Sequence, residues 1–230
     1  MLKPRSRGSS GTARAAAAAL RPRRPGPGGR SSAMEGQGAD GAEAGTEGSG
    51  GDALSVVFFD FDSTISSPQF VERFHEYALA DNPKLFAAMT QAEVVANFGG
   101  AERVRRLAAM LQRLQECGVE LFIISLGVTT AIRRHLSAVG LADFFAVERI
   151  YGQDSPELSG VRFRKPRLIQ RLLERRGWPR GRALFVDDDE RHISLCVELG
   201  TCPCLHVRGH GLCEEEMVAI EARARGPGGA

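Results

Sequence analysis

Short apolar runs that end in polar residues recur along the chain and predict a parallel β-sheet. The three clearest runs are Val56–Phe59, Val119–Ile124 and Ala183–Val186. Continuous apolar runs of this length are typical of strands that are buried on both faces. Two further strands are predicted over residues 144–151 and 202–207, where the apolar pattern is shorter or interrupted.

Between these strands the apolar residues recur at helical spacing. The clearest case lies C-terminal to Gly100, where one stripe carries Val104, Leu107 and Leu111 and the opposite face carries arginines. Alternating strands and helices predict an α/β fold, which we expect to be a Rossmann-like three-layer sandwich with a central, mainly parallel sheet. The helices are predicted over residues 101–117, 129–139, 167–177, 190–199 and 213–224.

Residues 66–100 interrupt the strand–helix alternation and are predicted to form a small helical cap insert. A first helix is expected after Ser66-Ser67-Pro68, where serine caps the helix and proline occupies its first turn. A second helix is expected within residues 83–98, because Asp81-Asn82-Pro83 breaks the first one. The aromatic residues of this insert are interpreted as its own core.

The first 52 residues contain almost no large apolar side chains and are predicted to be disordered. Residues 1–34 carry eight basic residues and no acid, whereas residues 35–52 carry five acids and no base. The basic part resembles an organelle transit peptide, and the alternative is a low-complexity tail without a targeting role. The acidic, glycine-rich part is interpreted as a linker to a folded core over residues 53–225, and residues 226–230 as a disordered tail.

Composition restricts the class of protein and its compartment. The chain has 230 residues and a net charge of +2, but the charged tail accounts for the excess and the remainder is nearly neutral. We therefore expect no nucleic-acid partner. No apolar run is long enough to span a bilayer, so no membrane association is expected. Five cysteines without a secretory signal predict reduced thiols in an intracellular protein, located in a chloroplast or mitochondrion if the tail is a transit peptide and otherwise in the cytoplasm.

Three cysteines and two histidines lie close together near the C-terminus and raise the question of a zinc site. Their spacing does not match the usual pairs of zinc ligands. The alternative is a set of half-buried residues on the last strand, which is the interpretation that the spacing favours. The residues concerned are Cys202, Cys204, His206, His210 and Cys213.

Two carboxylates, Asp60 and Asp62, follow the first predicted strand. In open α/β sheets, functional groups lie beyond the carboxyl ends of the strands. Neighbouring carboxylates repel each other, so such a pair calls for an explanation. One explanation is a divalent cation that offsets the charge. Another is catalysis, in which one carboxylate acts as nucleophile and the other as acid/base. The structural alternative is an Asx turn in which Asp62 and Ser63 cap local backbone amides.

Polar residues also follow the other strands. Ser125 and Gly127 end the second strand ahead of a helix, whose free backbone amides suit an anion such as phosphate. Lys165 precedes Pro166 and a helix, and taken alone it is interpreted as a surface lysine. The strand Ala183–Val186 leads into four consecutive acids, Asp187 to Glu190, which either interact with a helix dipole or hold a cation.

Taken together, these residues stand in the order of the four motifs of the haloacid dehalogenase (HAD) superfamily, which the chain resembles over roughly residues 54–207. The first motif, DxDxT, matches Asp60-Phe61-Asp62-Ser63-Thr64. The second is a serine at the end of an apolar strand, the third a lysine before a helix, and the fourth a pair of acids after an apolar strand. These positions are Ser125, Lys165 and Asp187-Asp188.

The resemblance implies an enzyme that hydrolyses phosphomonoesters through an aspartyl-phosphate. Asp60 would be the nucleophile and Asp62 the acid/base. Ser125, Lys165, Gly127 and Thr64 would bind the phosphoryl group. Mg²⁺ would be held by Asp60, the backbone carbonyl of Asp62, and Asp188. Asp187 would be a further ligand or a group that supports the ligands, although Asp187, Asp188 and Asp189 all compete for this role.

Several alternatives stay open within this resemblance. Asp62 argues against the dehalogenase branch, which lacks the second carboxylate, and the Ser-Leu-Gly second motif departs from phosphoserine phosphatases. A phosphomutase shares the chemistry, and a catalytically idle HAD-like binding module is the alternative from another class. A small cap would leave the site open, so the phosphorylated substrate is expected to be a small molecule or a phosphoprotein. The oligomeric state is not predicted.

Overall fold

The computed structural model describes residues 53–68, 88–209 and 211–226. In this part of the chain, five strands form one parallel sheet in the order β3-β2-β1-β4-β5. The strands are β1 (Val56–Phe59), β2 (Glu120–Ile124), β3 (Ile150–Tyr151), β4 (Ala183–Asp187) and β5 (Cys204–His206). The predicted α/β fold with a central parallel sheet is therefore confirmed.

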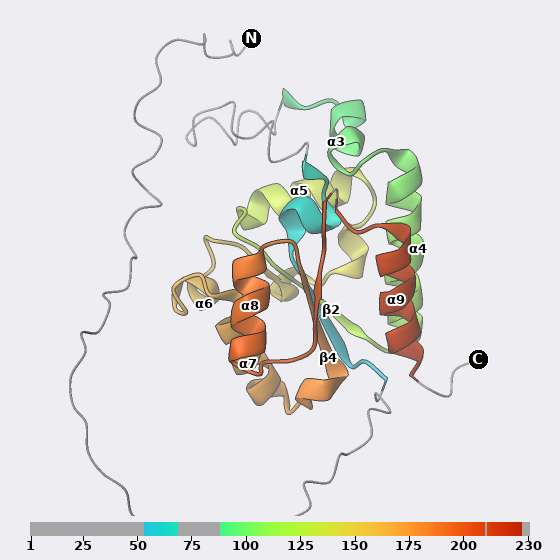
Figure 1. Ribbon diagram of the computed structural model, residues 1–230. Coiled ribbons are helices and arrows are strands. Elements are labelled where there is room, and N and C mark those ends of the chain that lie inside the picture. The colour runs from blue at the N-terminus through green and yellow to red at the C-terminus, as the bar shows by residue number, and fades with distance from the viewer. Residues whose placement is uncertain (1–52, 69–87, 210, 227–230) are drawn as a thin grey trace, which may run out of the picture. The chain divides into compact units, whose positions relative to one another are not determined.

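Helices cover both faces of this sheet (Figure 1). The helices α4 and α9 lie on one side, and α7 and α8 lie on the other. The described helices are α3 (Gln91–Asn97), α4 (Ala101–Glu116), α5 (Thr129–Ala138), α6 (Pro156–Ser159), α7 (Lys165–Arg176), α8 (Glu190–Glu198) and α9 (Glu214–Arg225). Among the described residues, no helix combines the length and the apolar character needed to cross a bilayer.

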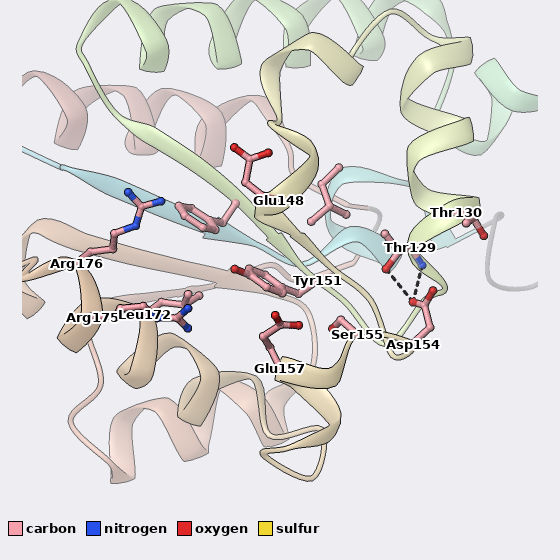
Figure 2. Close-up of a pocket in the computed structure, with 12 residues that line it drawn as sticks. Thr129, Thr130, Glu148, Tyr151, Asp154, Ser155, Glu157, Leu172, Arg175 and Arg176 are labelled. Atoms are coloured by element: carbon pink, nitrogen blue, oxygen red, sulfur yellow. Dashed lines mark hydrogen bonds between the residues drawn. The ribbon is translucent and has the colours of Figure 1, made fainter.

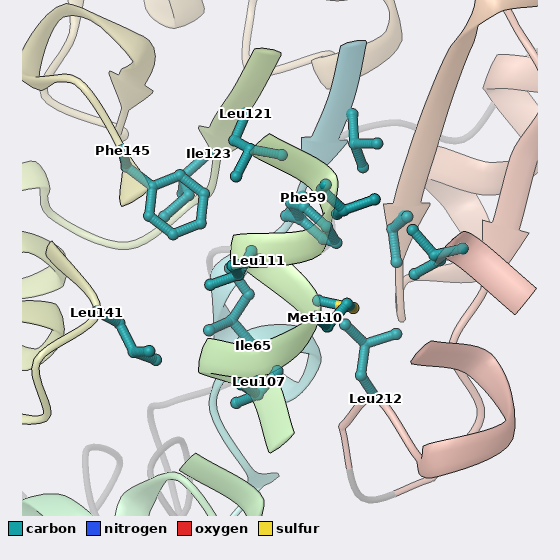
Figure 3. Close-up of a cluster of buried hydrophobic side chains, with 14 of the residues drawn as sticks. Phe59, Ile65, Leu107, Met110, Leu111, Leu121, Ile123, Leu141, Phe145 and Leu212 are labelled. Carbon is teal, nitrogen blue, oxygen red and sulfur yellow. The ribbon is translucent and has the colours of Figure 1, made fainter. Parts of the chain in front are cut away.

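Alternate residues of the strands enter two separate cores, as the period of a strand requires. Val57 and Phe59 of β1 pack with α4, α5 and α9, whereas Val56 and Phe58 pack with α7 and α8. The first of these cores is shown in Figure 3, where Leu107, Met110 and Leu111 of α4 lie against the strand residues. A strand buried on both faces must be apolar at every position, which explains the continuous apolar runs.

One prediction concerns this first core, in which Leu107 is fully buried. Leu107→Ala is expected to lower the free energy of unfolding by about 2–5 kcal/mol, because it removes buried methyl groups and leaves a cavity. Urea unfolding measures the change. The matched control is Val197→Ala on α8, where the side chain is 67% exposed, and it should stay within about 0.5 kcal/mol of the wild type. Equal effects of both substitutions would contradict the described packing.

The prediction of a strand over residues 144–151 is wrong for most of this segment. The structure has two short 3-10 segments, Ala142–Phe144 and Val147–Arg149, and only Ile150 and Tyr151 pair with β2. Phe145 inserts its side chain into the core beside α4 and α5. An apolar residue is therefore needed here to anchor a turn to the core, and not to form a strand. The one-turn helix α6 follows β3 after a short turn.

The cap insert predicted over residues 66–100 lies partly outside the described residues, because residues 69–87 are not described. Of the helix predicted over 83–98, the described part contains α3, which begins after Thr90. Thr90 and Glu93 form a capping box, in which the Thr90 side chain accepts from the Glu93 amide and Glu93 accepts from the Thr90 amide. The tails predicted over residues 1–52 and 226–230 also lie outside the described residues, apart from Gly226.

Candidate functional site

Asp60 lies directly beyond the carboxyl end of β1, at the crevice between β1 and β4. The chain moves from β1 to β2 and β3 on one side of the sheet and then to β4 and β5 on the other. Such a switch point is where α/β sheets hold their functional groups. The Asp60 amide donates to the carbonyl of Val186 at 2.8 Å, which extends the strand pairing to this residue. Asp60 as a whole residue is only 3% exposed.

Asp62 lies in a tight turn, Phe61–Ile65, that follows Asp60. Within this turn Asp62 has an extended conformation and Ser63 has a φ of 57°, a left-handed value that is unusual outside glycine. The turn directs Asp62 toward the end of β2, where the Ser125 hydroxyl donates to Asp62 Oδ2 at 3.4 Å. The Gly127 amide donates to Ser125 Oγ at 3.0 Å. A Cβ at Gly127 would lie 3.2 Å from Asp62 Oδ2, so glycine permits this close approach.

Lys165, the first residue of α7, is buried and joins two carboxylates. Its Nζ lies 2.8 Å from Asp60 Oδ1 and donates to Asp187 Oδ2 at 2.8 Å. Burial lowers the pKa of Lys165, but the charges of Asp60 and Asp187 outweigh burial and the net shift is upward. Lys165 is therefore a buried cation of the site and not the surface lysine that its position alone suggested.

The three consecutive aspartates after Val186 have different surroundings. Asp187 is the last residue of β4 and is fully buried, with Oδ2 accepting from Lys165 and Oδ1 accepting from the Asp189 amide at 2.8 Å. Asp189 caps α8 by accepting from the Arg191 amide, and its ion pair with Arg191 lowers its pKa to about 2. Asp188 lies between them and faces the hollow described below.

Asp60, Asp187 and Asp188 each offer a carboxylate oxygen, and these oxygens lie within 4.8 Å of one another. Burial raises the pKa of Asp60 to about 7, although Lys165 acts in the opposite direction. Burial, followed by the charge of Asp60, raises the pKa of Asp188 to about 6. Among the described residues this is the only such group of acidic, histidine or cysteine ligands. The group provides the hard oxygen ligands that a divalent cation prefers.

These residues open onto a hollow of about 250 Å³. Ser63 and Leu126 line it and were not among the site residues proposed from the sequence, because their types carry no signal apart from their neighbours. Asp189, which the sequence offered as a competing metal ligand, also lines it. Thr64 was proposed, yet it is fully buried and does not line the hollow. The complete lining is Asp60, Asp62, Ser63, Leu126, Lys165, Asp188 and Asp189.

A larger cavity of about 540 Å³ lies beside β3, between α5 and α7. Figure 2 shows Tyr151 in this cavity, with Arg175 and Glu157 nearby and Thr129 hydrogen-bonded to Asp154. None of the residues proposed from the sequence lines it. Its charged side chains do not form a group of converging carboxylates, so the smaller hollow is the better candidate for chemistry.

The cysteines near the C-terminus do not form a metal-ligand group in the described residues. Cys202 and Cys204 pack against the second core, and both are half-buried. Cys204 is a residue of β5, as expected, whereas Cys202 lies just before this strand. His206 of β5 instead contacts the site, because its Nε2 lies 3.1 Å from the carbonyl oxygen of Asp188. His210 lies outside the described residues.

Comparison with known proteins gives one family match. Residues 90–202 match the model of the haloacid dehalogenase-like hydrolase family. No curated protein sequence matches the chain. The match begins after the first motif and includes Ser125, Lys165 and the three aspartates that follow Val186.

Three bacterial proteins are among the solved structures to which this chain is similar. A haloacid dehalogenase-like family hydrolase from Streptococcus pneumoniae shares 17% identity over 73% of this chain and 90% of that chain, with a TM-score of 0.45. A HAD family hydrolase from Deinococcus radiodurans, solved with phosphate and sodium, shares 19% identity over 74% and 90%, with a TM-score of 0.41. CbbY from Rhodobacter sphaeroides, solved with phosphate, shares 16% identity over 68% and 87%, with a TM-score of 0.42.

Proposed function

Because the chain belongs to the haloacid dehalogenase-like hydrolase superfamily, we propose that it is a Mg²⁺-dependent phosphomonoester hydrolase that acts through an aspartyl-phosphate. One observation carries the proposal: carboxylates from the ends of two neighbouring strands, Asp60 and Asp188, converge in a hollow beside a buried lysine. Such an arrangement combines a nucleophile, a cation site and a fixed positive charge for a phosphoryl group.

In the first step, Asp60 attacks phosphorus, and the bond between phosphorus and the alcohol oxygen of the substrate breaks. Asp62, in its protonated form, gives its proton to the departing alcohol oxygen. Lys165 and Ser125 donate to phosphoryl oxygens, and the Gly127 amide, which lies 3.0 Å from Ser125 Oγ, is proposed as a further donor beside them. Thr64 is fully buried and lies outside the lining of the hollow, so its proposed role is to hold the turn, with its carbonyl accepting from Arg103 and from the Leu212 amide.

In the second step, the ionised Asp62 takes a proton from water, whose oxygen attacks phosphorus. The bond between phosphorus and Asp60 then breaks, which releases inorganic phosphate and restores the Asp60 carboxylate. Before the substrate binds, the Ser125 hydroxyl donates to Asp62 Oδ2 and directs Asp62 toward the end of β2; with the substrate bound, its one proton goes to a phosphoryl oxygen. One carboxylate therefore serves as acid and then as base, and it ends the cycle protonated as it began, with a proton that came from water.

The donor set fits Mg²⁺, which prefers oxygen ligands and usually keeps several waters. Asp60 and Asp188, with the backbone carbonyl of Asp62, would hold the ion. Asp187 would support this site mainly by orienting Lys165, because both of its oxygens already accept hydrogen bonds. When bound, Mg²⁺ supplies positive charge that offsets the carboxylates and the phosphoryl oxygens.

The experiment that tests the proposal is a phosphatase assay on the full chain. Hydrolysis of p-nitrophenyl phosphate is expected with Mg²⁺ and not with EDTA. The rates of hydrolysis of phosphopeptides, sugar phosphates and nucleotides should then be compared. A small cap would leave the site open, so bulky phosphorylated substrates are expected to be accepted. No hydrolysis of any of these esters with Mg²⁺ would contradict the proposed function.

The raised pKa values predict how Mg²⁺ stabilises the protein at different pH. Without metal, the folded chain holds protons on Asp60 and Asp188 up to about pH 7 and about pH 6, above the ordinary value of 3.8. The folded state therefore binds more protons than the unfolded state, and its stability falls as pH rises from about 4 to about 7. Mg²⁺ requires ionised ligands, so it should raise the melting temperature more at about pH 8 than at about pH 5.

Differential scanning fluorimetry with and without Mg²⁺ measures this effect. Asp188→Asn should remove most of the stabilisation by Mg²⁺, because it removes a ligand that faces the hollow. Asp189→Asn is the matched control and should keep the stabilisation, because Asp189 is engaged with Arg191 and the start of α8. The same gain in melting temperature at both pH values, or the reverse result for the two variants, would contradict this ligand set.

A further inference from the structure

We propose that Arg103 is a positioning residue that fixes the turn Phe61–Ile65 and thereby the orientation of Asp62. This inference rests on the proposed function, in which Asp62 is the acid/base. Arg103 lies on α4, and it reaches the turn from outside the hollow, without lining it. It was not among the candidate residues that the sequence suggested.

The guanidinium group of Arg103 donates to four backbone carbonyls. Nη1 donates to Ile65 at 2.7 Å and to Phe98 at 2.9 Å. Nη2 donates to Thr64 at 2.9 Å, and Nε donates to Leu212 at 3.1 Å. These carbonyls belong to three segments that are far apart in the sequence. Arg103 therefore joins the end of the turn to the end of α3 and to the loop before α9.

Two glycines leave room for this arrangement. Gly211 has a φ of +84°, and a Cβ there would lie 2.5 Å from Arg103 Nη2 and 2.6 Å from the carbonyl oxygen of Ser66. Gly99 has a φ of +78°, and a Cβ there would lie 3.0 Å from Arg103 Cδ. Side chains at these positions would displace the guanidinium group, so the surrounding backbone is shaped to receive it.

Asp62 depends on this anchor more than Asp60 does. Asp60 is fixed by its backbone bond to Val186 and by Lys165, neither of which involves Arg103. Asp62 is followed by Ser63, whose left-handed conformation persists only if the surrounding structure holds it. The carbonyls of Thr64 and Ile65, which come next, are the ones that Arg103 holds. Loss of these bonds should therefore let Asp62 move while Asp60 stays in place.

A lysine cannot replace the guanidinium group in this role. Arginine presents five donors in a planar fork, whereas lysine presents three donors on one nitrogen. Burial lowers the pKa of Arg103 to about 10, so the group remains charged at neutral pH. Arg103→Lys would keep the charge and most of the side-chain length, but it could not reach carbonyls in three directions.

The test compares two esters that differ in their need for Asp62. An aliphatic phosphate such as glycerol 2-phosphate needs protonation of its alcohol, whereas p-nitrophenyl phosphate releases a stable phenolate. Arg103→Lys is expected to lower kcat/KM by about 100-fold for the aliphatic ester and by less than about 10-fold for p-nitrophenyl phosphate. Gly211→Ala, which crowds Arg103 without removing it, should shift the ratio of the two values in the same direction.

Arg113→Met is the matched control on the same helix. Arg113 donates to both oxygens of Glu221 on α9, at 2.7 and 2.5 Å, and has no bond to the turn. Its loss should lower stability and leave the ratio of the two kcat/KM values unchanged. Equal losses for both esters in the Arg103 and Gly211 variants, or no loss, would overturn the inference. A wild-type chain that hydrolyses neither ester would overturn the proposed function itself.

Discussion

Replacing Asp60 with asparagine is expected to lower phosphate-ester hydrolysis on the order of 10⁴-fold or more, because the amide is a poor nucleophile. The same substitution should stabilise the metal-free protein at neutral pH. Burial raises the pKa of Asp60 to about 7, so keeping this carboxylate ionised opposes folding. The expected combination is a loss of activity with a higher melting temperature in EDTA.

The phosphatase assay and thermal unfolding, measured on the same preparation, check this pair of effects. Asp143→Asn is the matched control, since Asp143 is exposed and lies outside the hollow. It should change neither quantity appreciably. An Asp60→Asn variant with more than about a tenth of wild-type activity would contradict the role of Asp60 as nucleophile.

Replacing Lys165 with methionine is expected to abolish activity and to destabilise the chain by about 3–5 kcal/mol at neutral pH, because it leaves Asp60 and Asp187 buried without a counter-ion. Both carboxylates lie 2.8 Å from Lys165 Nζ. The destabilisation should shrink at about pH 5, where the orphaned carboxylates, whose pKa values burial already raises, take up protons.

Urea unfolding at the two pH values measures this effect. The double variant Lys165→Met with Asp187→Asn serves as control, because it removes one of the two orphaned charges. It should recover part of the stability at neutral pH and none of the activity. A Lys165→Met chain as stable as the wild type at neutral pH would contradict the buried ion pairs.

The arrangement of strands and the convergence of polar residues follow from the sequence for a simple physical reason. A strand buried on both faces must be apolar throughout, so the run ends where the sheet ends. Asp60, Ser125 and Asp187 each mark such an end, and parallel strands place their carboxyl ends at one edge. The resemblance to the superfamily then identified Lys165, which its own position on the chain did not.

Other features depend on contacts that leave little trace in the local pattern. The apolar residues near Phe145 predict a strand as well as they predict an anchored turn, and only the register with β2 decides between them. The different environments of Asp187, Asp188 and Asp189 depend on where β4 stops. The contacts of Arg103 are with backbone carbonyls, which every residue possesses, so residue types carry no sign of them.

The central claim is that Asp60 carries the phosphoryl group between the two steps. Rapid mixing with p-nitrophenyl phosphate and Mg²⁺, acid quenching and reduction with borohydride would convert an aspartyl-phosphate to homoserine, which peptide mass spectrometry can locate. We expect homoserine at position 60 in the wild type and at no position in Asp60→Asn. A modified residue at another position, or turnover without any modified residue at 60, would contradict the account.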